Sequence, residues 1–131
     1  MKLKGREINP GQVSGQALVL DAPFSFIGEF DPQTGQLVLE GHPLNGQSLA
    51  GKVLVCPSGK GGTIAPFIAY QAKQNGTAPI AIVCEQVDPM LCECALVLDI
   101  PMADSFAQSP VQILETGQTV HMSGGELTIE E

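Results

Sequence analysis

The sequence predicts an α/β domain in which a β-rich, barrel-like sheet carries one embedded parallel βαβ unit. Short apolar runs alternate with Gly and Pro along the chain, which has 15 Gly and 10 Pro, and this punctuation is typical of many short strands. Near the middle, a helical pattern stands between two continuous apolar runs. The chain has 131 residues, 44% of them apolar, so we treat 1–131 as a single domain with its own core.

The N-terminal part is predicted to be β-structure. Residues 16–20 and 24–27 are short apolar runs, and residues 36–39 follow a turn-like segment, Asp-Pro-Gln-Thr-Gly, at 31–35. We therefore expect three short strands before residue 40.

The middle of the chain predicts the βαβ unit. Residues 52–56 and 79–83 are continuous apolar runs with the length of buried strands. Apolar residues at helix spacing lie between them, namely Ile64, Phe67, Ile68 and Ala72. Thr63 is the expected N-cap and Gly76 the expected stop of this helix. A strand, a helix and a strand in this order imply that the two strands are parallel.

The C-terminal third is predicted to add more strands. The apolar runs lie at residues 95–98, 111–114, 119–122 and 127–129. The sequence Ser-Gly-Gly at 123–125 predicts the turn of a final hairpin between the last two runs.

Charge and composition exclude several functions. The formal net charge is −8, and a phosphate backbone or an anionic membrane surface would repel such a chain, so we expect neither nucleic acid nor membrane as a partner. The start of the chain shows no apolar leader segment, and no run is long enough to span a bilayer, which favours the cytoplasm. The four cysteines are then expected to be thiols.

A glycine-rich loop between the first βαβ strand and the helix is the best candidate site. It comprises Pro57, Ser58, Gly59, Lys60, Gly61, Gly62 and Thr63. Glycines let backbone N–H groups approach a ligand, and the helix N-terminus and Lys60 add positive charge, which predicts a site for a carboxylate or a phosphate. A nucleotide P-loop is excluded because it needs Ser or Thr directly after the lysine, and Gly61 stands there.

The other chemically capable residues favour structural roles. Cys84, Cys92 and Cys94 could hold a metal ion, but their spacing is not that of a zinc site, and Cys92 and Cys94 would share the core face of a strand. His42 and His121 are isolated in sequence. No serine–histidine–acid grouping can be argued from position. We therefore predict no metal site in this chain.

A set of segments in order resembles the aconitase X swivel-domain family. They are 10–19 (Pro-Gly-Gln-Val-Ser-Gly-Gln-Ala-Leu-Val), 25–28 (Ser-Phe-Ile-Gly) with Asp31 and Thr34-Gly35, 49–55 leading into the glycine-rich loop, 75–79 (Asn-Gly-Thr-Ala-Pro), and Ile100-Pro101 with Asp104. The resemblance covers nearly the whole chain and rests on the order and spacing of these segments.

The resemblance implies a swivelling β/β/α fold like the fourth domain of aconitase. It implies a small subunit that forms a heterodimer with a large catalytic subunit carrying an iron–sulfur cluster, with no cofactor in this chain. The implied reaction is water elimination from a small anionic hydroxy acid, either mevalonate 5-phosphate or a 3-hydroxyproline isomer. In the family, a serine of the glycine-rich loop removes a proton, and the cluster acts as a Lewis acid on the leaving hydroxyl.

The loop departs from the family pattern at its serine. That pattern has Gly, Lys or Arg, Gly, Ser, and Gly62 stands at the serine position. Thr63 or Ser58 is then the candidate base, with Gly59, Lys60, Gly61 and Gly62 as the substrate-binding residues. The alternative is a non-catalytic structural or regulatory partner that has lost its base, and a metal protein using the three cysteines is a third hypothesis.

Overall fold

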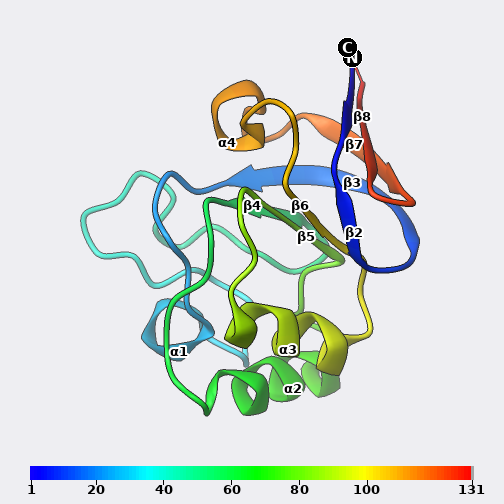
Figure 1. Ribbon diagram of the computed structural model, residues 1–131. Coiled ribbons are helices and arrows are strands. Elements are labelled where there is room, and N and C mark those ends of the chain that lie inside the picture. The colour runs from blue at the N-terminus through cyan, green and yellow to red at the C-terminus, as the bar shows by residue number, and fades with distance from the viewer. Residues whose placement is uncertain (131) are drawn as a thin grey trace.

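This computed structural model describes residues 1–130, whose strands join in one eight-stranded sheet with helices on both faces (Figure 1). The strands are β1 (Lys2–Lys4), β2 (Arg6–Asn9), β3 (Gln12–Val19), β4 (Val53–Cys56), β5 (Ala81–Cys84), β6 (Met102–Asp104), β7 (Thr119–Ser123) and β8 (Glu126–Ile129). The helices are α1 (Phe26–Glu29), α2 (Ala65–Asn75), α3 (Pro89–Leu98) and α4 (Pro110–Ile113). The predicted α/β class is confirmed.

The centre of the sheet is parallel and its flanks are antiparallel. The strand order is β1-β8-β7-β3-β4-β5-β6-β2, with β3, β4, β5 and β6 parallel to one another. β4, α2 and β5 form the predicted βαβ unit, with Val53 opposite Ala81 and Cys56 opposite Cys84. The predicted hairpin of β7 and β8 is also present. The two edge strands of the sheet, β1 and β2, are consecutive in the chain. That the sheet closes into a barrel-like shape stays a prediction.

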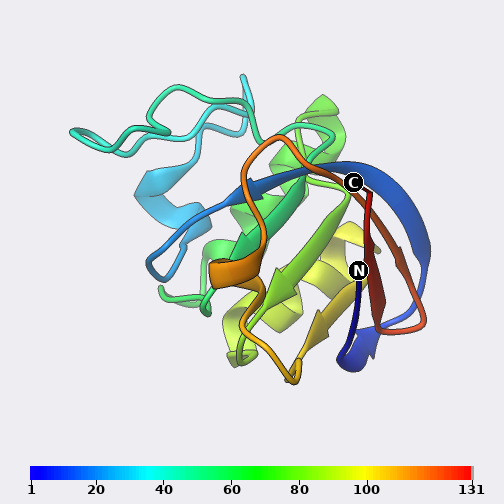
Figure 2. The same cartoon turned by 90° about the horizontal axis from the view of Figure 1, so that it is seen from above.

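The sheet buries both of its faces, which follows from the two-residue period of a strand. In β4, Leu54 and Cys56 face the core under α2 and α3, and Val53 and Val55 face the core under α4. Figure 1 shows α4 above the sheet and α2 and α3 below it, and Figure 2, seen from above, shows α4 in front of the sheet. Continuous apolar runs in β4 and β5 are therefore explained by burial on both faces.

One buried carboxylate joins the last parallel strand to the edge strand. Asp104 is 0% exposed and accepts hydrogen bonds from Arg6 Nε at 2.9 Å, from Arg6 Nη2 at 3.0 Å and from the Val87 N–H at 2.9 Å. Burial alone would raise the pKa of Asp104, but these hydrogen bonds outweigh it and hold the pKa below its usual value. The ion pair thus fixes β2 against β6.

Two predicted strands of the C-terminal third are wrong. Residues 95–98 belong to α3, whose N-cap Asp88 accepts hydrogen bonds from the N–H groups of Met90 and Leu91. Residues 111–114 fall on the short helix α4, which Ser109 caps and Pro110 begins. In both cases a capping side chain followed by proline begins the helix. This helix-start signal outweighs the strand that the apolar run after it would predict.

Two predicted strands of the N-terminal part are also wrong, whereas the first is confirmed as part of β3. Phe24 makes one isolated bridge to Gly59, and the residues after Ser25 turn into α1. Residues 36–39 contribute only isolated bridges at Gln36 and Leu37.

Among residues 1–130, no helix is long and apolar enough to cross a bilayer.

The predicted helix α2 is present, but its cap and its buried face differ from the prediction. Ile64, not Thr63, is the N-cap, and no side chain caps the helix. The residues that α2 buries are Ala65, Ala69 and Ala72. Small side chains allow α2 to lie close to α3, so the larger Ile64 and Phe67 are left exposed.

Candidate anion-binding loop

The glycine-rich loop leaves β4 after Cys56 and enters α2 at Ala65, on the side of the sheet that α2 and α3 cover (Figure 1). Its first half is tied to the segment before α1. The Phe24 N–H donates to the Ser58 carbonyl at 3.0 Å, and the Lys60 N–H donates to the Phe24 carbonyl at 2.9 Å. Phe24 is fully buried, so these bonds anchor the loop to the core.

The loop lies against its neighbours so closely that two of its glycines leave no room for a side chain. A Cβ at Gly59 would collide with Asp88 Oδ1 and approach Leu91 Cβ to 2.8 Å. Gly61 has φ +124°, and a Cβ there would collide with Ser25 Oγ. At Gly62 the nearest atom is Ile27 Cδ1 at 3.9 Å, so this position has room for a side chain.

The second half of the loop presents unpaired backbone donors. Within residues 1–130, the N–H groups of Gly61, Gly62, Thr63 and Ile64 donate no hydrogen bond. They lie directly before the 11-residue helix α2, whose N-terminus carries partial positive charge. Consecutive unpaired N–H groups at a helix N-terminus form a cradle for an anionic group.

Lys60 is oriented by a carboxylate from α1. Its Nζ lies 3.1 Å from Glu29 Oε2, and Glu29 Oε1 accepts from the Ser25 N–H at 2.9 Å. The Lys60 side chain is 53% exposed, so its ammonium can still meet a ligand beside the loop. Sequence reasoning missed Glu29 and Ser25 because only the fold brings α1 next to the loop.

The two candidate hydroxyls lie in different surroundings. Ser58 is partly buried, and its Oγ donates to the Gly59 carbonyl at 3.3 Å. Thr63 is exposed, and its hydroxyl has no hydrogen bond within the described part of the chain. The geometry therefore leaves the Thr63 hydroxyl available to a ligand in the cradle and holds Ser58 in the loop framework.

The chain was also compared with known protein families. The family model of the aconitase X swivel domain matches residues 2–130. The chain belongs to the aconitase X swivel-domain family.

Similar proteins extend over the full length of this swivel domain. It is 43% identical over 130 residues to the phosphomevalonate dehydratase small subunit of Methanosarcina acetivorans, which covers 99% of this chain and 90% of that protein. It is 40% identical over 133 residues to the protein of the same name in Thermococcus sibiricus, with 100% of both chains covered. A crystal structure of Thermococcus kodakaraensis aconitase X, in its holo-form, superimposes with a TM-score of 0.92 at 39% identity and covers 100% of this chain and 99% of that one.

The thiols of the swivel domain have the environment of structural cysteines. Cys56 and Cys84 lie opposite each other on β4 and β5, and Cys94 is buried on α3. Burial raises the pKa of Cys84 and of Cys94 to about 12, with smaller contributions from nearby carboxylates. Cys92 and Cys94 lie on a helix rather than on one face of a strand. No group of three His, Cys, Asp or Glu within residues 1–130 could hold a metal ion.

The fold does assemble one serine–histidine–acid grouping that position in the sequence does not predict. Ser14 Oγ lies 2.6 Å from His121 Nδ1, and His121 Nε2 lies 3.0 Å from Glu130 Oε2. Ser14 on β3, His121 on β7 and Glu130 just after β8 are all exposed, without the water-excluding enclosure that activates a serine in hydrolases. The cross-strand pair Ser14–His121 thus has the character of a surface contact within the sheet. His42 forms an exposed pair with Asp21 at 3.4 Å.

Proposed function

We propose that this chain is the small subunit of an aconitase-X-type hydro-lyase that eliminates water from mevalonate 5-phosphate. In this proposal it completes an active site on a larger subunit. The observation that carries the proposal is the cradle of unpaired N–H groups next to the exposed Thr63 hydroxyl, in a chain that matches the family over its whole length. The names of its relatives, dehydratase small subunits, support the reaction class and a larger partner.

The iron–sulfur cluster of this proposal belongs to the partner. The chain's own donors do not fit a cluster, because Cys84 and Cys94 have a pKa of about 12 and no three metal ligands converge among the described residues. When present on the large subunit, the cluster would act as a Lewis acid on the leaving hydroxyl.

The cradle would bind the substrate through an anionic group. The N–H groups of Gly61 and Gly62 and the N-terminus of α2 offer hydrogen bonds and positive potential to a phosphate or a carboxylate. Lys60 adds a full charge, and Glu29 keeps its ammonium beside the loop. Together these residues would orient the substrate so that its reacting carbon faces the large subunit.

Thr63 is the residue that we assign as base. A neutral threonine hydroxyl cannot take a proton from carbon, so the base would be its alkoxide, formed when the hydroxyl gives its own proton to solvent. Positive potential from the helix N-terminus and Lys60 would stabilise that alkoxide. Ser58 is the second candidate, but its hydroxyl is bonded to the Gly59 carbonyl. The deprotonated Thr63 Oγ1 would take the proton from the carbon next to the one that carries the leaving hydroxyl. The electrons of that C–H bond would form the C=C bond as the hydroxyl leaves as water.

The test is steady-state turnover by the complex reconstituted anaerobically with its large subunit. Mevalonate 5-phosphate and the 3-hydroxyproline isomers serve as alternative substrates. We expect Thr63→Ala to lower kcat by at least about 100-fold, the scale of general acid–base catalysis, with Thr63→Ser retaining most of the activity. Ser58→Ala is the matched control and should change kcat by only a few-fold. Unchanged turnover in both alanine variants would show that neither hydroxyl is the base.

Gly62 favours a second candidate function, a non-catalytic partner. The family's serine position holds glycine, and the space around it accepts a side chain. If the chain binds a large subunit but adds no turnover, and Gly62→Ser creates turnover, this second function is correct. If the wild-type complex already turns over, it is wrong.

A further inference from the structure

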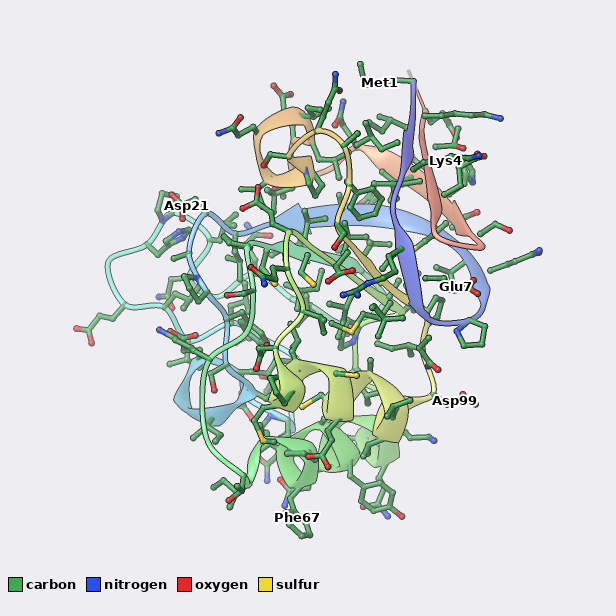
Figure 3. The ribbon with its side chains drawn as sticks, in the orientation of Figure 1. Met1, Lys4, Glu7, Asp21, Phe67 and Asp99 are labelled. Atoms are coloured by element: carbon green, nitrogen blue, oxygen red, sulfur yellow. The ribbon has the colours of Figure 1, made fainter. Side chains whose placement is uncertain are left out.

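The start and first half of α2 expose large apolar side chains, whereas the exposed residues of its second half are polar. Its largest side chains are exposed, Ile64 to 54%, Phe67 to 70% and Tyr70 to 49%. Phe67 and Tyr70, with Pro66 and Val97, line a shallow cavity of about 270 Å³. Figure 3 shows Phe67 extending from α2 away from the sheet. We call these five residues the α2 apolar face.

The helix α2 buries small side chains and exposes large apolar ones, which is the reverse of the usual arrangement. The helix buries Ala65, Ala69 and Ala72 and turns its aromatic residues outward. A cluster of exposed aromatic and aliphatic residues marks an interaction surface more often than an isolated exposed residue does. Phe and Tyr also bury much apolar area for little loss of conformational freedom, so they suit the centre of an interface.

Four residues of the α2 apolar face, at 64, 66, 67 and 70, lie in a part of the chain that lacks carboxylates, whereas Val97 lies on α3 one turn after Glu93. Residues 41–84 contain Lys52, Lys60 and Lys73 and no Asp or Glu, in a chain with net charge −8. Lys73 lies at the edge of the face, because its Nζ donates to the Val97 carbonyl at 3.3 Å. A complementary partner would present an apolar pocket whose acidic rim lies opposite Lys73.

The face is continuous with the candidate site. Ile64 follows Thr63 directly and is the N-cap of α2, so a protein that covers the face also reaches the cradle. The partner of a hydro-lyase small subunit must do both, because the cradle holds the substrate and the partner supplies the rest of the active site.

We propose that the α2 apolar face docks on the large subunit, in an apolar pocket with an acidic rim. The inference rests on the proposed function. Docking through α2 fixes the helix whose N-terminus binds the substrate anion, and it places Thr63 at the boundary between the two subunits.

Titration calorimetry of the chain with its anaerobically purified large subunit tests this inference. Phe67→Ser and Tyr70→Ser should each raise the Kd at least tenfold. In the free chain Phe67 is 70% exposed and Tyr70 is 49% exposed, so the loss of either side chain should cost the fold little stability. Lys73→Glu should weaken binding and reduce its dependence on salt. Val38→Ser is the matched control, because Val38 is 51% exposed and lies outside the face. The variants' melting temperatures establish that they are folded.

The outcomes separate the inference from the proposed function. The inference is supported if Phe67→Ser and Tyr70→Ser bind the large subunit more weakly than wild type and Val38→Ser binds it equally well. If all these variants bind as tightly as wild type, the inference is overturned and the proposed function still stands. A chain that binds no large subunit refutes both. Self-association of the chain alone that Phe67→Ser abolishes would make the face a homodimer surface and overturn the inference.

Discussion

Gly61 and Gly62 offer a matched pair of substitutions that tests the geometry of the loop. Gly61 has φ +124° and lies against Ser25 Oγ, whereas Gly62 does not have a positive φ and has open space around it. For an L-residue, the conformation of Gly61 costs about 1–3 kcal/mol, to which the contact with Ser25 adds. Gly62→Ala avoids both costs and should leave the free energy of unfolding within about 0.5 kcal/mol of wild type.

We expect Gly61→Ala to lower the free energy of unfolding by about 1–3 kcal/mol, or to displace the loop and so relieve the strain. In a domain of this size each kcal/mol corresponds to about 3–6 °C in Tm. Urea unfolding measures the first result, and phosphate binding followed by calorimetry measures the second, because displacement misaligns the unpaired N–H groups. Gly61→Ala and Gly62→Ala proteins with equal stability and equal phosphate affinity would refute the loop geometry.

Two further predictions concern buried ionisable groups. The pKa of Asp104 is lower in the folded than in the unfolded chain, so its stabilising contribution is present above about pH 4 and is lost as the pH falls through the folded-state pKa. Urea unfolding from pH 7 to pH 2 should therefore show a steeper acid-side loss of stability in wild type than in Asp104→Asn, and equal slopes would contradict the role of the Arg6–Asp104 pair. Because Cys84 and Cys94 have a pKa of about 12, they should resist iodoacetamide at pH 8 in the native chain and react in urea, as peptide mass spectrometry would show; rapid native labelling would contradict their burial.

The sequence predicts the βαβ unit and the final hairpin because their signals are local. Continuous apolar strands, a helical stripe and a Ser-Gly-Gly turn each act within a few residues. The failure at α3 has an identifiable cause. Its buried residues are Leu91, Cys94, Ala95 and Leu98, which have helical spacing, and Asp88 with Pro89 is a helix start. The high apolar content of the segment concealed this period, so the missed signal was present in the sequence.

The candidate site was predicted only in its local part. The glycine-rich loop, Lys60 and the two hydroxyls are contiguous in sequence, whereas Glu29 and Ser25 reach the loop through α1 and through the burial of Phe24. Aromatic contacts at 5.0 Å and 5.2 Å hold Phe24, Phe26 and Phe30 in that core. The spacing of apolar residues along the sequence does not predict such a tertiary contact. Likewise, the choice between Thr63 and Ser58 required their exposure, which depends on the packed loop.

The most direct test of the central claim is water elimination from mevalonate 5-phosphate, measured anaerobically with the large subunit alone and with this chain added. We expect turnover only when both chains are present, with a rate that saturates at one small subunit per large subunit. A large subunit that turns over equally well without this chain, or a stable complex with no turnover of any tested hydroxy acid, would contradict the claim that the chain completes the active site.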